Sequence, residues 1–325
     1  MIHTTRRALT ATTALGAGVL LVLATAGCGT DGASGADGSA DASGGAVVTS
    51  FYPLQFATRQ ITGSALPVTV LTKPGAEPHD LELAPQDVGG LTQARLVIYA
   101  DGFQPAVDEA MGEVAPSRVL DVADAASLTL DAADEEIRNH SAAAAGDNAK
   151  HASADPHFWL DPQRYAAVAT AIGARLAADD PAHAAQYRAN TAAFVARLTT
   201  LDHDLKVGLA SCDSTVLVTS HAAFGYFAQR YGLDQHGISG LSPEAEPSAA
   251  GLKEVSNLVR AKKVGTIFQE TLVEPKFAQT VATSTGATLS TLDPIEGITA
   301  ESAGKDYFEV MRSNLTALQK GLGCS

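Results

Sequence analysis

The chain has 325 residues, of which 18% are charged, and its formal net charge is −14 at pH 7. This acidic balance argues against a phosphate backbone as a partner, so we expect no binding to nucleic acid. The chain is too long to fold around one small hydrophobic core, which indicates two lobes of ordinary size.

The N-terminus has the pattern of a secretory signal. Arg6 and Arg7 precede an apolar run at residues 14–26, which is too short to span a bilayer. Small residues then precede Cys28, as in bacterial lipoprotein signals, where the cysteine carries the lipid. We therefore expect residues 1–27 to be a lipoprotein signal peptide and Cys28 to be lipidated. The alternative is an ordinary cleaved signal with a chance cysteine.

The next segment, residues 28–45, consists almost wholly of Gly, Ser, Ala, Asp and Thr after its first residue. It buries too little apolar surface to offset the entropy of ordering, so we expect a flexible tether. A coil of this length reaches roughly 20–25 Å. These features predict an extracytoplasmic protein that is lipid-anchored to the cell membrane.

Short β-branched runs alternate with helix-like segments along the rest of the chain. We expect strands at 47–51, 67–71, 94–99, 118–122, 215–219, 237–241, 264–269 and 288–292. We expect helices at 53–62, 222–231, 248–261 and 275–285. Strict alternation predicts parallel sheets covered by helices. The expected fold class is α/β, with two lobes that each contain a mostly parallel four-stranded sheet.

One long helix is predicted between the two halves. Asp180 suits the N-cap, Pro181 suits the first helical position, and an apolar stripe continues to Gly208. A helix of roughly 27 residues is about 40 Å long, so we expect a rigid connector. The predicted parts are an N-terminal lobe at 46–179, the connector at 180–209 and a C-terminal lobe at 210–325.

The remaining histidines outside the strand ends are interpreted as follows. Residues 131–154 are polar and Ala-rich, contain His140 and His151, and are expected to form a mobile loop. Surface positions are expected for His183 and His203 on the connector and for His236 in a loop.

Two histidines occupy places where open α/β sheets bind ligands, beyond the carboxyl ends of strands or in rigid loops. His79 comes shortly after the second predicted strand. His157 lies between two prolines that fix the backbone, next to Phe158 and Trp159, which bury it. A rigid, partly apolar imidazole suits a metal site.

A third histidine, His221, directly follows the strand expected at 215–219. We expect it in the first turn of the next helix, where the helix dipole disfavours protonation and keeps the imidazole neutral for a metal. The same dipole opposes a bound cation, which predicts an anionic fourth ligand. Glu296 and Asp293, at the end of the last strand, are the candidates.

Five motifs together resemble the metal-binding cluster of the zinc and manganese solute-binding proteins of ABC transporters. They are Pro-Gly-x-Glu-Pro-His at 74–79, Asp-Pro-His-x-Trp-Leu-Asp-Pro at 155–162, Thr-Ser-His-x-Ala-Phe-Gly-Tyr at 219–226, Leu-Ser-Pro-Glu-Ala-Glu-Pro-Ser at 241–248 and Leu-Asp-Pro-Ile-Glu-Gly at 292–297. The resemblance spans residues 47–324. It implies two lobes joined by a rigid helix, with one metal in the cleft between them.

The resemblance implies that His79, His157 and His221 are ligands and that Glu296 is the fourth, with Asp293 or water as the alternative. Manganese members usually have Glu third and Asp fourth. A nitrogen-rich set with one carboxylate favours Zn²⁺ over Mn²⁺. The family's motifs further suggest that Glu244, Glu246 and Glu270 orient the ligands, although the first two suit helix capping equally well.

The function implied by the resemblance is that of the solute-binding component of an ABC importer. Such a protein binds Zn²⁺ as cargo, delivers it to the permease subunits in the membrane, and needs no cofactor; we expect a monomer. A manganese-binding member and a metal-dependent surface adhesin are the alternatives. We expect no enzyme, because the sequence has no His-Glu-x-x-His pattern of zinc hydrolases.

Cys212 and Cys324 are the two cysteines other than Cys28. An even pair in an exported protein predicts a disulfide bond, with two buried thiols as the alternative. The bond would tie the C-terminal tail to the start of the first strand of the second lobe.

Overall fold

The computed structural model describes residues 45–130 and 154–325, which belong to one compact unit. The expected signal peptide, Cys28 and nearly all of the tether lie outside the described residues. So does almost all of the expected loop, with His140 and His151. Within the described ranges, no helix combines the length and the apolar character that crossing a membrane requires.

The first sheet contains four parallel strands in the order β2-β1-β3-β4. The strands are β1 (Val47–Thr49), β2 (Val68–Val70), β3 (Leu96–Tyr99) and β4 (Val119–Asp121). The helices are α1 (Tyr52–Thr62), α2 (Pro85–Gln93), α3 (Pro105–Ala110) and α4 (Ala123–Ala126), with short 3-10 helices at Met111–Glu113 and Pro116–Arg118. We call this part the N-terminal lobe.

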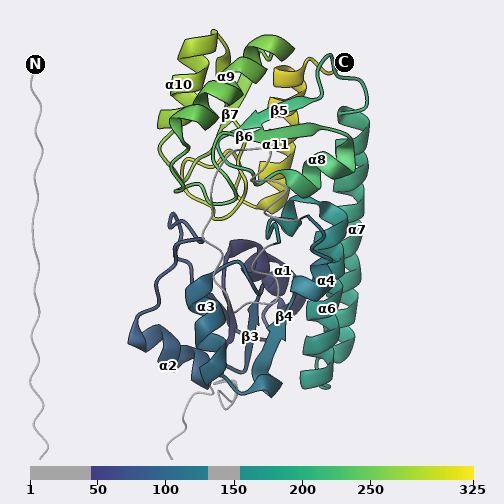
Figure 1. The fold of residues 1–325 in the computed structure, drawn as a ribbon. Coiled ribbons are helices and arrows are strands. Elements are labelled where there is room, and N and C mark those ends of the chain that lie inside the picture. The colour runs from purple at the N-terminus through teal and green to yellow at the C-terminus, as the bar shows by residue number, and fades with distance from the viewer. Residues whose placement is uncertain (1–44, 131–153) are drawn as a thin grey trace, which may run out of the picture. The chain divides into compact units, whose positions relative to one another are not determined.

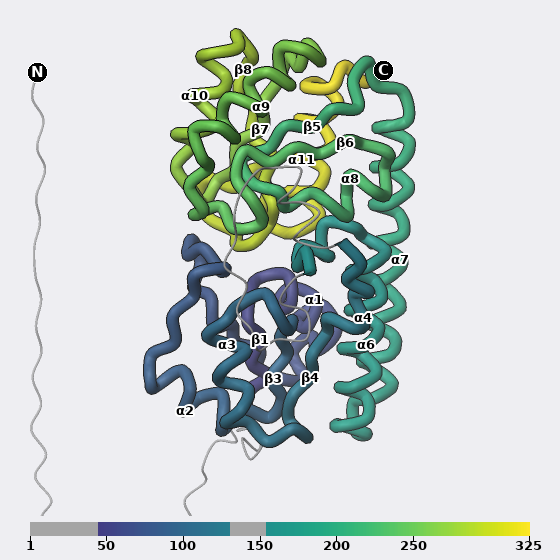
Figure 2. The backbone as a smooth tube through the Cα atoms, viewed as in Figure 1, coloured from purple at the N-terminus to yellow at the C-terminus, as the bar shows by residue number. Residues whose placement is uncertain are grey.

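The second sheet repeats this topology, with the order β6-β5-β7-β8 and parallel pairing throughout. Its strands are β5 (Val216–Thr219), β6 (Asp234–Gly237), β7 (Thr266–Gln269) and β8 (Thr288–Thr291). Its helices are α8 (Gly225–Tyr231), α9 (Ala249–Lys262), α10 (Lys276–Thr285) and α11 (Tyr307–Leu322). Figure 2 shows β5, β6 and β7 close together in this C-terminal lobe. The predicted fold class is confirmed.

A pair of long helices, α6 (Pro162–Asp179) and α7 (Ala184–Gly208), lies between the two sheets in the sequence. The 25-residue α7 packs along α6, contacts α1 of the N-terminal lobe and reaches α11 of the C-terminal lobe (Figure 1). The long joining helix is therefore confirmed. Its partner α6 was not predicted, although Asp161 caps it by accepting a hydrogen bond from Gln163 N.

The start of the joining helix was predicted wrongly. Pro181 lies in the turn between α6 and α7, and His183 is the N-cap of α7. The carboxylate of Asp180 contacts His183 Nδ1 and accepts a hydrogen bond from the Tyr187 hydroxyl, both at 2.8 Å. An Asp-Pro pair thus stabilises the turn rather than the first helical position.

The sixth strand was also misplaced. The prediction was 237–241, whereas β6 ends at Gly237. His236 consequently lies on this strand and not in a loop, with Nε2 3.2 Å from Asp234 Oδ2. The polar sequence of β6 is tolerated because this strand lies at the edge of the sheet, where it pairs only with β5.

The main hydrophobic core extends through both lobes. Aromatic side chains of α1, α6, α7 and α11 meet there: Phe56 lies 5.8 Å from Phe194 and 6.0 Å from Phe308 between ring centroids, and Tyr165 lies 4.8 Å from Tyr307. Burial of one such side chain stabilises the fold by about 1.5–3 kcal/mol. The lobes therefore share packing instead of meeting at a free hinge.

A disulfide bond joins Cys212 and Cys324. The same two residues form an antiparallel β-bridge, and Ser214 N donates to Leu322 O. The segment before β5 is thereby attached to the end of α11.

Candidate metal centre

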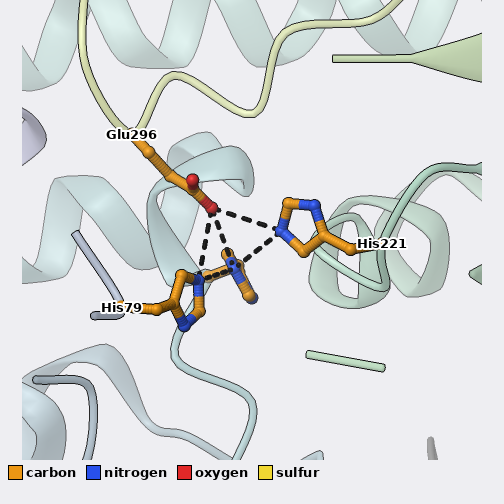
Figure 3. A group of neighbouring side chains, drawn as sticks. His79, His221 and Glu296 are labelled. Carbon is orange, nitrogen blue, oxygen red and sulfur yellow. Dashed lines mark hydrogen bonds and ion pairs between the residues drawn. The ribbon is translucent and has the colours of Figure 1, made fainter. Parts of the chain in front are cut away.

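Four side chains from four separate segments converge on one point. His79 lies in the loop between β2 and α2, and His157 immediately precedes a 3-10 turn, Phe158–Leu160. His221 follows β5, and Glu296 follows β8. One ligating atom of each lies within 4.8 Å of the others. Figure 3 shows the rings of His79 and His221 directed at the carboxylate of Glu296.

The separations have the scale of a tetrahedral coordination shell. Glu296 Oε1 is 3.4 Å from His79 Nε2, 3.3 Å from His157 Nε2 and 3.2 Å from His221 Nε2. His157 Nε2 is 3.2 Å from His79 Nε2 and 3.4 Å from His221 Nε2. Ligands about 2.0–2.1 Å from a tetrahedral Zn²⁺ lie roughly 3.3–3.4 Å apart. Five of the six edges therefore fit an ion of this size.

The site is largely shielded from solvent, although the His79 side chain is 9% exposed. His157 and Glu296 are 0% exposed and His221 is 2% exposed. The ring of Phe103 meets His79 edge-on at 4.7 Å, and Trp159 lies 5.2 Å from His157 between centroids. No hydrogen bond from the described residues reaches either carboxylate oxygen of Glu296 with satisfactory geometry. A buried carboxylate is costly unless it is paired, which makes this site suited to a cation.

Carboxylates behind two of the imidazoles fix the ring orientations. Asp155 Oδ1 is 2.8 Å from His157 Nδ1 and also accepts a hydrogen bond from His157 N at 2.9 Å. Glu270 Oε1 is 2.9 Å from His221 Nδ1. A proton on each Nδ1 donates to the carboxylate, which leaves the Nε2 lone pair directed at the centre of the site.

The same contacts shift the protonation equilibria. Burial lowers the pKa of His79. Burial also acts to lower the pKa of His221, but the charge and hydrogen bond of Glu270 outweigh it, and the pKa is raised well above the usual value. The pKa of His157 is raised in the same way, by Asp155 against burial. Burial acts to raise the pKa of Glu296, but the imidazoles hold it well below its usual value.

A comparison with known proteins identifies the family. The family model described as zinc-uptake complex component A, periplasmic, matches residues 47–321. The chain belongs to this family. The resemblance noted from the motifs is thereby confirmed. Zinc-uptake components are metal-binding proteins and not enzymes.

Curated relatives agree with this membership. The zinc-binding protein AdcA of Streptococcus pyogenes serotype M3 is 34% identical over 283 residues, covering 84% of this chain and 55% of AdcA. The chain thus spans about half the length of these AdcA relatives. The high-affinity zinc uptake system protein ZnuA of Bacillus subtilis is 32% identical over 299 residues, covering 90% of this chain and 92% of ZnuA.

Solved structures show the same fold. The Zn(II)-bound ZnuA-like domain of Streptococcus pneumoniae AdcA has a TM-score of 0.69 and 32% identity, covering 86% of this chain and 99% of the domain. The laminin-binding protein Lmb of Streptococcus agalactiae has a TM-score of 0.72 and 33% identity, covering 86% of this chain and all of Lmb. Lmb is described as a bifunctional protein with adhesin and metal-transporting activity.

One expectation about His221 is wrong for this member of the zinc-uptake family. Helix α8 begins at Gly225, with Phe224 as its N-cap, so His221 lies before the helix and not in its first turn. The dipole argument therefore does not apply. Glu270 acts in the opposite direction on the pKa of His221, and it sets the ring orientation in place of the dipole.

Asp293, the alternative fourth ligand, lies outside the cluster. Its Oδ1 accepts a hydrogen bond from Ile295 N at 2.7 Å, and burial raises its pKa to about 6. Ile295 has φ 59°, a left-handed conformation that β-branched residues rarely adopt. Asp293 thus stabilises the tight turn that directs Glu296 inward.

Of the three glutamates suggested to support the ligands, Glu270 is the one that contacts a ligand. Glu244 and Glu246 are exposed, and Ser248 caps α9 by accepting a hydrogen bond from Gly251 N. Asp155 was missed as a supporting residue. A local sequence pattern could have indicated this role. An Asp two residues before a His can accept a hydrogen bond from the backbone N–H of the His and also contact its ring, as Asp155 does with His157.

Proposed function

We propose that the protein is the extracytoplasmic solute-binding component of an ABC importer, which captures Zn²⁺ at His79, His157, His221 and Glu296 and delivers it to the permease in the membrane. The observation that carries this proposal is the tetrahedral spacing of three ring nitrogens and one carboxylate oxygen. The ion is cargo, and its proposed ligands include residues that follow strands of both sheets.

Three features favour zinc over manganese. Three imidazoles and one carboxylate form a borderline-soft ligand set, which suits Zn²⁺, whereas Mn²⁺ prefers oxygen ligands and six-fold coordination. The separations fit four ligands, and the burial of His157 and Glu296 disfavours the additional water ligands that an octahedral ion needs. The family described as zinc-uptake components supports the same choice.

The proposal includes the anchor and the division of the chain. Residues 1–27 are the signal peptide, Cys28 carries the lipid, and 28–45 tether a monomer to the membrane. The N-terminal lobe covers 46–179, the connector 180–209 and the C-terminal lobe 210–325. The name of a Streptococcus pneumoniae relative, zinc-binding lipoprotein AdcA, supports the anchor.

Metal analysis of the purified protein tests this function. We expect one Zn²⁺ per chain after exposure to an equimolar metal mixture, and no displacement of Zn²⁺ by an excess of Mn²⁺. Retention of Mn²⁺ in preference to Zn²⁺, or an undiminished zinc content after Glu296→Ala, would contradict the assignment.

A further inference from the structure

The buried hydroxyl of Tyr226 joins two parts of the metal centre. Tyr226 lies on α8, five residues after His221, and is 0% exposed. Its oxygen accepts hydrogen bonds from Thr129 N at 3.1 Å and Leu130 N at 3.4 Å, and it donates one to Asp155 O at 3.0 Å. One side chain of the C-terminal lobe therefore satisfies three backbone groups that belong to the other side of the site.

The backbone held by this hydroxyl belongs to the residue that orients His157. The Asp155 carboxylate contacts His157 Nδ1 and accepts from His157 N. Asp155 N donates to Leu130 O at 3.0 Å, which links the two backbone segments that meet at Tyr226. A displacement of Asp155 thus moves the imidazole of His157.

A cation–π contact also holds the ring of Tyr226 in position. The guanidinium of Arg164, on α6, lies 4.2 Å from the centroid of the Tyr226 ring. Arg164 also donates to Ala126 O at 2.9 Å and to Thr129 Oγ1 at 3.1 Å. Because this contact restricts the movement of the ring, the position of the Tyr226 hydroxyl is fixed.

We propose that Tyr226 is a positioning residue of the metal centre, whose hydroxyl fixes His157 relative to His221 and so maintains the 3.4 Å between their Nε2 atoms. This inference rests on the proposed function. Removal of the hydroxyl takes this partner from the N–H groups of Thr129 and Leu130 and from the buried C=O group of Asp155, so we expect the segment that contains Asp155 to shift. Loss of a residue that supports a ligand typically weakens metal binding by about 10–100-fold.

The test is Tyr226→Phe, with Tyr165→Phe as the matched control. Tyr165 is also 0% exposed, and its hydroxyl donates to a backbone carbonyl, Pro53 O, at 2.5 Å, but this carbonyl does not support a ligand. We expect both variants to bind one Zn²⁺ per chain, with the larger loss of thermal stability in Tyr226→Phe, whose hydroxyl has more hydrogen-bond partners. Only Tyr226→Phe should lose about tenfold in zinc affinity by chelator competition, through faster dissociation.

Two further measurements distinguish an effect on the geometry of the metal site from a general effect on the stability of the fold. The visible absorption of bound Co²⁺ reports ligand geometry, and it should change in Tyr226→Phe but not in Tyr165→Phe. In a double-mutant cycle with Asp155→Asn, the effects on zinc affinity should be non-additive, because the hydroxyl acts through Asp155.

Wild-type affinity and an unchanged Co²⁺ spectrum in Tyr226→Phe would show that the hydroxyl only stabilises the fold, and the inference would be wrong. Additive effects in the cycle would equally exclude action through Asp155. Failure of the wild-type protein to bind zinc is a different result, since it overturns the proposed function together with this inference.

Discussion

Glu296 supplies the negative charge among the four converging side chains, and its position depends on local backbone geometry. Ile295 adopts a left-handed conformation immediately before it, and such strain in a bulky residue costs on the order of 1–3 kcal/mol. The hydrogen bond from Ile295 N to Asp293 maintains this conformation. The turn places the carboxylate where three ring nitrogens reach the same oxygen.

Each histidine ligand should be indispensable, because no other described residue is positioned to replace it. We expect His221→Ala to weaken zinc binding by more than about 100-fold, since loss of a supporting partner alone typically costs about 10–100-fold. Isothermal titration calorimetry with a competing chelator measures this. His183→Ala is the control, since His183 is half-exposed and pairs with Asp180 at the N-terminus of α7. Equal affinities in the two variants would refute the assignment of His221.

The charge of Glu270 should matter even though the residue does not face the centre of the site. Glu270→Gln removes the negative charge behind His221 Nδ1, which makes the imidazole a weaker ligand. We expect zinc affinity to fall by about tenfold at pH 7.5. Glu244→Gln changes an exposed carboxylate and serves as the control. If both variants bind zinc equally well by chelator competition, Glu270 has no supporting role.

At the scale of elements, α8 is attached to the helix pair by a polar network as well as by Tyr226. Arg230 on α8 donates to Asp202 on α7, with Nη2 2.7 Å from Oδ2, and its Nε lies 3.3 Å from Asp161 Oδ1. The hydroxyl of Tyr231 donates to Asp202 Oδ1 at 2.9 Å. The network connects the C-terminal lobe to α6 and α7 through a partly buried carboxylate.

This network predicts a pH-dependent contribution to stability. Burial acts to raise the pKa of Asp202, but hydrogen bonds from Arg230 and Tyr231 outweigh it, so the pKa is lowered from 3.8 in the folded protein. A carboxyl group whose pKa is lowered by folding stabilises the folded state at pH values above its pKa in the unfolded chain. This contribution is lost as the pH falls through its pKa in the folded protein. We expect Asp202→Asn to cost about 1–2 kcal/mol at pH 7.

Urea unfolding of the wild type and Asp202→Asn at several pH values checks this prediction. The difference in the free energy of unfolding should narrow below about pH 4, where the unfolded carboxyl takes up a proton. Asp204 is exposed on the same helix, so Asp204→Asn should change the free energy of unfolding little at any of these pH values. A difference that stays constant down to pH 3 would mean that the charge of Asp202 is not the stabilising feature.

The same elements show which parts of the structure could be predicted from sequence. Valine-rich strands such as β1 and β5 were placed correctly, because their residues combine β propensity with burial. Strand β6 reads Asp-Gln-His-Gly and has no β-branched residue, so its position depends on pairing with β5. Likewise, Asp180 and Pro181 resemble a helix start, yet Asp180 lies before a turn and contacts His183 and Tyr187 at the start of α7.

The candidate ligands were predictable because each lies in a short motif with its own local geometry. The contact between Glu270 and His221 was harder to derive, because 49 residues separate them and only the fold brings them together. Tyr226 belongs to the His221 motif, but its three backbone partners lie 71 to 97 residues earlier in the chain. Sequence patterns therefore predict the candidate ligands, whereas folding determines which residues support them.

At the scale of the whole molecule, protons and zinc should compete for the same ring nitrogens. Zinc binds the deprotonated Nε2 atoms, so its apparent affinity should fall as the pH drops. Because Glu270 outweighs burial and raises the pKa of His221, the fall should begin above the ordinary histidine value of about 6.5. The raised pKa of His157 should make the dependence steeper than one proton per metal.

Chelator competition between about pH 5.5 and 8.5 measures this dependence, since the range brackets the ordinary histidine pKa. His183→Ala should give the wild-type profile. A flat profile would mean that imidazoles are not the principal ligands, and the metal centre would then have to be sought among the acidic residues.

The wide spacing of the ligands along the chain has a topological consequence. His79 and His157 are separated by 78 residues, and His157 and His221 by 64, so an ion that binds all four side chains closes long loops in the chain. The four side chains are assembled in the folded chain and not in the unfolded chain, so an ion that binds them stabilises the folded form by mass action. Under the proposed function, the transported ion is therefore a reversible cross-link between segments that lie far apart in the sequence. Under the proposed function, removal of the ion by the permease also removes this stabilisation, so we expect release of the ion and local loosening of the chain to occur together.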